Sequence, residues 1–235
     1  MSFTPRLENA GVDAWLVRLF DQIDEANIDW IQSLAKLCER HFGSQLIDLV
    51  PSYTTLLVHY DCLQLDADQA RWQLLELVQQ LQRDQTSGPS QIHELPIWYD
   101  PQVGPDLPRL EKLTGLSWQQ LVERHAQSSY RVFALGFAPG FAFMGKLPTE
   151  LQFPRLTTPR QQVPANSLGI AEQQTAIYPK ASPGGWNLIG RGCKQLFDPQ
   201  RQPPSLLQVG DRISFQPVTK AEFLRLGGNP QEALL

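Results

Sequence analysis

Long apolar runs are missing from this sequence, and cysteine is scarce. No segment approaches the roughly 18 apolar residues of a membrane-spanning helix, and the first residues, MSFTPRLEN, lack the basic-then-apolar order of a signal peptide. The three cysteines (Cys38, Cys62 and Cys193) are odd in number and far apart, which excludes a disulfide framework. We therefore expect a cytoplasmic protein that neither crosses a membrane nor is secreted.

Several kinds of chemistry lack their usual motifs. The formal net charge is −4 and Lys and Arg do not cluster, so a nucleic-acid partner is not expected. The four histidines show no HxxxH or HExxH spacing, and Cys38 with His41 lacks a partner pair, so we expect no metal bound by this chain. The G-x-S-x-G and Walker A motifs are also absent, which excludes a nucleophile elbow and a P-loop.

Glycine and proline are distributed unevenly along the chain. The first 87 residues hold only two of each, whereas eight of the 16 glycines and seven of the 19 prolines fall between residues 134 and 192. This contrast predicts two domains, residues 1–91 and 92–235, with the boundary near the polar, breaker-rich segment 84–91.

The first domain reads as a ferredoxin-like α+β fold. We expect a strand over residues 12–20, an amphipathic helix over 24–42 and a hairpin of strands 46–50 and 53–60. A second helix begins after Asp66, which suits an N-cap. With a strand over 92–99, the order strand–helix–strand–strand–helix–strand predicts two helices on one face of an antiparallel sheet.

The second domain begins with helical signals and continues with short strands. Asp106 is predicted to cap one short helix and Gly115 to end it, while Ser117 and Gln120 fit a capping box for the next. His125 lies near the apolar face of that second helix and is expected to pack or cap. From residue 130 to 216, short strands alternate with Gly/Pro turns, which is typical of a β-barrel or sandwich.

Candidate binding residues gather in these turns. Gly184 and Gly185 follow a proline, so their backbone N–H groups allow close approach of an anion or a carbonyl. Arg155 and Arg160, each after a proline, could hold a carboxylate in bidentate fashion or could pair with acidic residues of this or a neighbouring subunit. Trp186 could line a pocket or anchor its strand.

Taken in order, these residues resemble the family of the 5-oxoprolinase B subunit, also called allophanate hydrolase subunit 1 or the kinase-A-inhibitor family. The resemblance covers roughly residues 96–217. It is carried by YD at 99–100, GPDL at 104–107, His125 ahead of Tyr130, GFAPGF at 136–141, PR at 154–155 and 159–160, YP at 178–179, SPGGW at 182–186 and GR at 190–191. It implies a ferredoxin-like α/β sandwich followed by a C-terminal cyclophilin-like β-barrel.

The resemblance also implies an activity, the ATP-dependent opening of 5-oxo-L-proline to L-glutamate. The implied 5-oxoprolinase is a cytoplasmic complex with a C subunit of related barrel fold and a third subunit of the lactam-utilisation type, and Mg²⁺ is expected with the ATP. A stabilised amide needs donors positioned for developing charge. We assign catalytic roles to Arg155, Arg160, Gln174 and Tyr178, and substrate binding to Ser167, Thr175, Ser182, Gly184, Gly185, Trp186 and Arg191.

An interface is expected beside these loops. Phe137, Phe141, Phe143 and Met144 would form an exposed apolar patch on a monomer, and such patches usually mark interfaces. We predict that Phe141, Phe143 and Met144 bind the C subunit, although these side chains could instead fill the barrel.

Four positions depart from the family pattern. Relatives usually have glycine where this chain has Asn166, Glu172 and Ala176, and threonine where it has Gly192. Asparagine tolerates the left-handed conformation, whereas a carboxylate at Glu172 would repel an anionic substrate. Two alternatives therefore stay open: a regulatory protein that binds and inhibits a sensor histidine kinase, and a carboxyltransferase-like subunit acting on urea or allophanate-type substrates. Peptidyl-prolyl isomerisation would rest on the fold alone.

Overall fold

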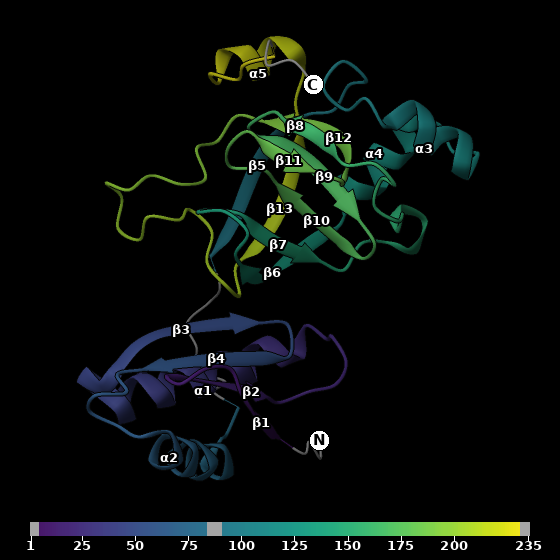
Figure 1. Cartoon of the computed structure of the whole chain (residues 1–235). Coiled ribbons are helices and arrows are strands. Elements are labelled where there is room, and N and C mark those ends of the chain that lie inside the picture. Colours follow the sequence, from purple (N-terminus) through teal and green to yellow (C-terminus); the bar gives the residue numbers. More distant parts are fainter. Residues whose placement is uncertain (1–4, 84–90, 231–235) are drawn as a thin grey trace. The chain divides into compact units, whose positions relative to one another are not determined.

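The structure is a computed structural model that describes residues 5–83 and 91–230 (Figure 1). The chain divides into two compact units, Met1–Ser90 and Gln91–Leu235, which are described separately. The segment at which the boundary was expected, residues 84–91, lies outside the described residues except for Gln91. Within the described ranges, no helix is long and apolar enough to cross a membrane.

The N-terminal unit is an antiparallel sheet with two helices on one face. The strand order is β1-β2-β4-β3. Alternate residues of β2 and β4, among them Val17 and Val58, share one core with Leu34 of α1 and Leu74 of α2, so both helices cover the same face, as predicted. The elements of this unit are β1 (Arg6–Asn9), β2 (Ala14–Arg18), α1 (Ala26–Phe42), the 3-10 turn η1 (Gly43–Gln45), β3 (Leu46–Ser52), β4 (Thr55–Tyr60) and α2 (Ala67–Gln80).

The prediction was wrong about which strand completes this sheet. The strand expected at residues 92–99 is β5 (Ile92–Trp98), and it pairs with β13 and β12 of the other unit. The fourth strand is instead β1, which pairs with β2. Because β1 has only four residues, three of them exposed, it lacks the apolar alternation that marks a strand in a sequence. The β3–β4 turn also lies two residues later than expected, after Ser52.

Seven strands of the C-terminal unit close into a barrel in the order β10-β7-β6-β13-β5-β12-β9 (Figure 1). The β13–β5 pair is parallel and the other barrel pairs are antiparallel. The barrel strands are β5 (Ile92–Trp98), β6 (Ser129–Leu135), β7 (Ala142–Gly145), β9 (Ser167–Ala171), β10 (Gln174–Ile177), β12 (Asn187–Gly192) and β13 (Arg212–Pro217). The closed barrel confirms the predicted α+β fold class.

Shorter elements surround the barrel. They are α3 (Leu107–Thr114), α4 (Trp118–Gln127), the 3-10 turn η2 (Thr149–Leu151), α5 (Lys220–Arg225) and a two-stranded sheet of β8 (Arg160–Val163) and β11 (Ser182–Gly184). Gly115 ends α3 in the left-handed conformation, and Ser117 and Gln120 form the capping box of α4, both as predicted. The cap predicted for Asp106 is wrong: its side chain makes no capping bond and binds elsewhere.

Candidate functional site

The β8–β11 sheet and its flanking loops bring six of the predicted site residues together: Arg155, Arg160, Tyr178, Gly184, Gly185 and Trp186. Gly184 lies opposite Arg160 in the sheet. A Cβ atom on Gly184 would lie 2.4 Å from the hydroxyl oxygen of Tyr178, so glycine is required here because the phenol fills the space. The residues of this loop cluster are thus packed against each other rather than spread along exposed turns.

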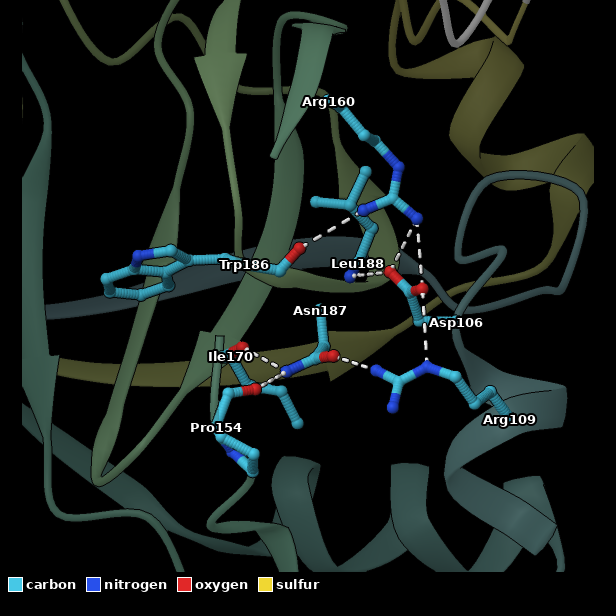
Figure 2. Close-up of polar contacts among 8 residues, drawn as sticks. All are labelled: Asp106, Arg109, Pro154, Arg160, Ile170, Trp186, Asn187 and Leu188. Atoms are coloured by element: carbon cyan, nitrogen blue, oxygen red, sulfur yellow. Dashed lines mark hydrogen bonds and ion pairs between the residues drawn. The ribbon is translucent and has the colours of Figure 1, made fainter. Parts of the chain in front are cut away.

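Asp106 holds Arg160 in place (Figure 2). Nη2 of Arg160 lies 2.9 Å from both carboxylate oxygens of Asp106, and Nη1 donates to the carbonyl of Trp186 at 3.3 Å. Asp106 also accepts the backbone N–H of Leu188 at 2.7 Å. The side chains of Asp106 and Arg160 are 7% and 19% exposed. Of the two roles left open for Arg160, pairing with an acidic residue of this chain is therefore the one that the structure adopts.

Asn187 connects this ion pair to the loop that carries Arg155, because it binds Arg109, whose Nε lies 3.9 Å from Asp106. Its Nδ2 donates to the carbonyls of Pro154 and Ile170 at 3.0 and 3.1 Å, and its Oδ1 accepts from Arg109 (Figure 2). On the other side of the loop, the N–H of Leu156 donates to the carbonyl of Gly185 at 2.7 Å. The backbone is therefore fixed on both sides of Arg155.

Arg155 is the cation of this cluster that faces solvent. Its guanidinium carbon lies 5.9 Å from the centre of the Trp186 ring, and the residue is exposed. Among the ion pairs within residues 5–83 and 91–230, none involves Arg155. A guanidinium held over an aromatic ring and without a counter-charge can take a carboxylate or a phosphoryl group in bidentate fashion.

Aromatic side chains form the base of the site. We call the buried residues Phe141, Val163, Ala171, Ala176, Tyr178, Trp186 and Leu188 the Trp186 cluster. Phe141 meets the Tyr178 and Trp186 rings edge-on, at centroid distances of 5.3 and 5.9 Å. The prediction that Phe141 and Met144 lie in an exposed patch is wrong, since both are buried; Phe143 is half-buried and only Phe137 is exposed. The residues that the sequence assigned to an interface are mostly core because alternate side chains pack on opposite faces: Met144 joins the barrel core, whereas Phe141 and Phe143 pack in the Trp186 cluster.

Tyr178 is a hydrogen-bonding group rather than a base. Burial raises the pKa of its phenol to about 12, and a backbone hydrogen bond from Trp186 and the charges of Arg155 and Arg160 only partly oppose this. The phenol is therefore protonated at neutral pH. Its hydroxyl lies against Gly184 inside the Trp186 cluster.

Thr175 lies in a different, fully buried network. Its hydroxyl is 3.0 Å from Nε2 of His125 and donates to the carbonyl of Gly169, while the hydroxyl of Tyr99 is 2.8 Å from Nδ1. Because Thr175 donates its only proton to Gly169, His125 donates through Nε2 and accepts from Tyr99 through Nδ1. Every polar group of this network is satisfied internally, so Thr175 is not placed to orient a substrate ring.

The packing of His125 shows where this network lies. Its ring stacks on Phe215 of β13 at 4.8 Å and also reaches β10, and these strands are not neighbours in the barrel. His125 of α4 therefore projects into the barrel interior, which confirms that it is a packed histidine. Burial lowers its pKa to about 3.

The remaining predicted residues occupy other positions on the strands of the C-terminal unit. Ser167 and Arg191 face each other across β9 and β12, and Arg191 donates to the carbonyl of Asn229. Gln174 opens β10, opposite Gly145. Ser182 lies in β11, opposite Val163, with its hydroxyl oxygen buried. Among the described residues, no group of three or more His, Cys, Asp or Glu side chains could hold a metal ion.

The departures from the family pattern have local explanations. Asn166 and Glu172 adopt φ of 60° and 54°, the conformation in which glycine is favoured. Ala176 is a buried member of the Trp186 cluster in ordinary strand geometry. A Cβ atom on Gly192 would lie 3.2 Å from Ile97, which leaves little room for threonine.

Three residues of the site were missed in the sequence. Asp106, Arg109 and Asn187 make its central polar contacts (Figure 2). The GPDL segment at 104–107 carried a signal for Asp106, but the position before a helix suggested a cap. Asn187 directly follows SPGGW, and its buried amide had no local pattern to mark it.

The family described as carboxyltransferase domain, subdomains C and D, matches residues 5–207 of the chain. The chain belongs to this family. The 5-oxoprolinase B subunit of Bacillus subtilis (strain 168) is 31% identical over 233 residues, 95% of this chain and 97% of that protein. The 5-oxoprolinase B subunit of Escherichia coli O157:H7 is 40% identical over 175 residues, 73% of this chain and 78% of that protein. The resemblance drawn from the motifs is confirmed.

A solved structure supports the fold of this carboxyltransferase-family chain. The urea carboxylase of Kluyveromyces lactis superposes with a TM-score of 0.77 at 19% identity, over 94% of this chain and 22% of that one. At this identity the likeness shows the fold alone. The relatives named above are, by name, subunits of a 5-oxoprolinase.

Proposed function

We propose that this chain is the B subunit of an ATP-dependent 5-oxoprolinase that opens 5-oxo-L-proline to L-glutamate. The observation that carries the proposal is the match to a 5-oxoprolinase B subunit over nearly the whole of both chains. The site geometry supports it, because an exposed arginine over an aromatic base suits a small carboxylate substrate.

Arg155 is the residue that contacts the substrate anion in this proposal. Arg160 already has a carboxylate partner in Asp106, whereas Arg155 has none among the described residues. Hydrogen bonds from Asn187 to the Pro154 carbonyl and from Leu156 to the Gly185 carbonyl fix the backbone on both sides of Arg155 before the substrate binds. Preorganisation of this kind reduces the entropy lost on binding.

The rest of the reaction belongs to the complex. ATP, accompanied by Mg²⁺, supplies the driving force for opening a stabilised amide. We propose that a C subunit and a third subunit of the lactam-utilisation type complete the enzyme in the cytoplasm. The contribution of this chain is to bind the substrate carboxylate and to hold it fixed while the ring carbonyl reacts.

Reconstitution tests the proposal. The chain is purified with the products of its genomic neighbours, and 5-oxoproline-dependent ATP hydrolysis and glutamate formation are measured. Replacing Arg155 by alanine should raise KM for 5-oxoproline about 10- to 100-fold, because one charge-assisted interaction is lost. Arg155→Lys, which keeps the charge but not the bidentate geometry, should lie between alanine and the natural chain.

Arg71→Ala is the matched control. Arg71 is an exposed arginine of α2 in the N-terminal unit, so its loss should leave KM unchanged. No glutamate from the reconstituted natural complex would overturn the proposed activity. Turnover with an unchanged KM in Arg155→Ala would keep the activity and remove Arg155 from the site.

A further inference from the structure

Phe137 holds an exposed aromatic ring in a conformation that is unfavourable for phenylalanine. The residue is 65% exposed and has φ of 70°. Its Cβ makes positive φ costly, and glycine would relieve the strain. A phenylalanine at this position therefore carries two costs: a strained backbone and an apolar ring exposed to water.

The surrounding turn enforces this conformation. The N–H of Ala138 donates to the carbonyl of Gly136 at 2.8 Å, which makes Phe137 the central residue of the rare γ-turn with positive φ. The N–H of Phe141 donates to Ala138, and the N–H of Gly136 donates to Phe141. Strained residues persist where their surroundings over-determine them, and they cluster at binding sites.

The ring of Phe137 stands beside the same aromatic base as Arg155. Its centroid is 5.2 Å from Phe141 and 6.5 Å from Tyr178, edge-on in both cases. Arg155 covers Trp186, which Phe141 also contacts, and its charge acts on Tyr178. An exposed apolar ring and an exposed guanidinium therefore flank the Trp186 cluster. This pair suits a small molecule that joins an apolar ring to a carboxylate.

We propose that Phe137 contacts the substrate ring and determines selectivity for a small cyclic carboxylate, resting on the proposed 5-oxoprolinase function. Phe137 takes the carbon face of the ring, while Arg155 takes the carboxylate. The two contacts act on different parts of the substrate and can be separated.

A neutral lactam separates them. In the reconstituted complex, 5-oxoproline is the substrate and 2-pyrrolidinone, which has the ring but no carboxylate, is the inhibitor. Phe137→Ala and Phe137→Gly should raise both KM and the inhibition constant at least tenfold, with kcat within twofold. Phe137→Leu, which keeps apolar bulk, should restore most of both. Arg155→Ala should raise KM but leave inhibition by 2-pyrrolidinone unchanged.

Stability and assembly provide further readouts. Phe137→Gly should unfold at a temperature no lower than the natural chain, because the strain is released. Leu113→Ala, at an exposed apolar residue of α3, is the control and should change neither constant. If the natural complex is active but Phe137→Ala changes neither KM for 5-oxoproline nor the inhibition constant for 2-pyrrolidinone, this inference is overturned and the proposed function stands.

Two other outcomes also decide the question. If Phe137→Ala no longer co-purifies with the other subunits, the ring is an interface residue and the inference is wrong. If the natural complex neither binds 5-oxoproline by calorimetry nor consumes it, the proposed function fails, and the role of Phe137 fails with it.

Discussion

Replacing Asp106 by alanine is expected to destabilise the C-terminal unit strongly. The carboxylate is 7% exposed and accepts from Arg160 and from the N–H of Leu188. Removing one partner of a buried ion pair costs about 3–5 kcal/mol, and a buried N–H left without an acceptor costs about 1–3 kcal/mol. Arg160 is partly solvated and keeps the carbonyl of Trp186, so we expect a combined loss of about 3 kcal/mol. This corresponds to a decrease in Tm of about 6–12 °C.

Calorimetry and hydrogen exchange measure this loss. The Tm of the C-terminal unit is compared between the natural chain and Asp106→Ala, and exchange of the Leu188 amide should accelerate in the variant. Glu8→Ala is the control, because Glu8 forms an exposed pair with Arg18, with the Nε–Oε1 distance 2.8 Å. Exposed pairs contribute little to stability, so the control should leave Tm unchanged within error.

A double-mutant cycle gives the result that would refute the reasoning. If Asp106 and Arg160 act through each other, the double alanine variant should lose less free energy of unfolding than the sum of the single variants, by about 1–3 kcal/mol. Additive losses, or a loss below about 1 kcal/mol for Asp106→Ala, would show that this pair does not hold β8 to the start of β12.

Two further predictions concern buried residues of the C-terminal unit. Burial lowers the pKa of His125 to about 3 in the folded chain, against about 6.5 for an unburied histidine, so its contribution to stability is present above pH 6.5 and lost as the pH falls toward 3. Between these values the free energy of unfolding from urea titrations should fall by about 1.4 kcal/mol less per pH unit in His125→Gln than in the natural chain, and equal slopes would contradict the assignment. Gly184→Ala should cost about 1–3 kcal/mol, because its Cβ would lie 2.4 Å from the Tyr178 hydroxyl. The control Gly136→Ala, with no atom within 4 Å of its Cβ, should be neutral in calorimetry, and a neutral Gly184→Ala would show that the phenol is free to move.

The sequence by itself determined the elements whose signals are local. Asp66 accepts from the N–H of Gln69, and Ser117 and Gln120 cap each other, in each case within one helical turn. Helical periodicity placed α1 and α2, and the density of glycine and proline located the barrel loops. The ordered motifs identified the family. All of these depend on contacts between near neighbours in the chain or on the order of residues, which a single sequence contains.

Only the tertiary structure decided the partners that are distant in the chain. Asp106 meets Arg160, 54 residues away, and Thr175 meets His125, 50 residues away. β5, predicted to join the ferredoxin-like sheet, pairs instead with β13 of the barrel. A strand has two edges and a carboxylate has several possible donors, so local pattern cannot choose between them. The choice is made by which pairing buries the apolar faces and satisfies the buried polar groups, and that depends on the whole barrel.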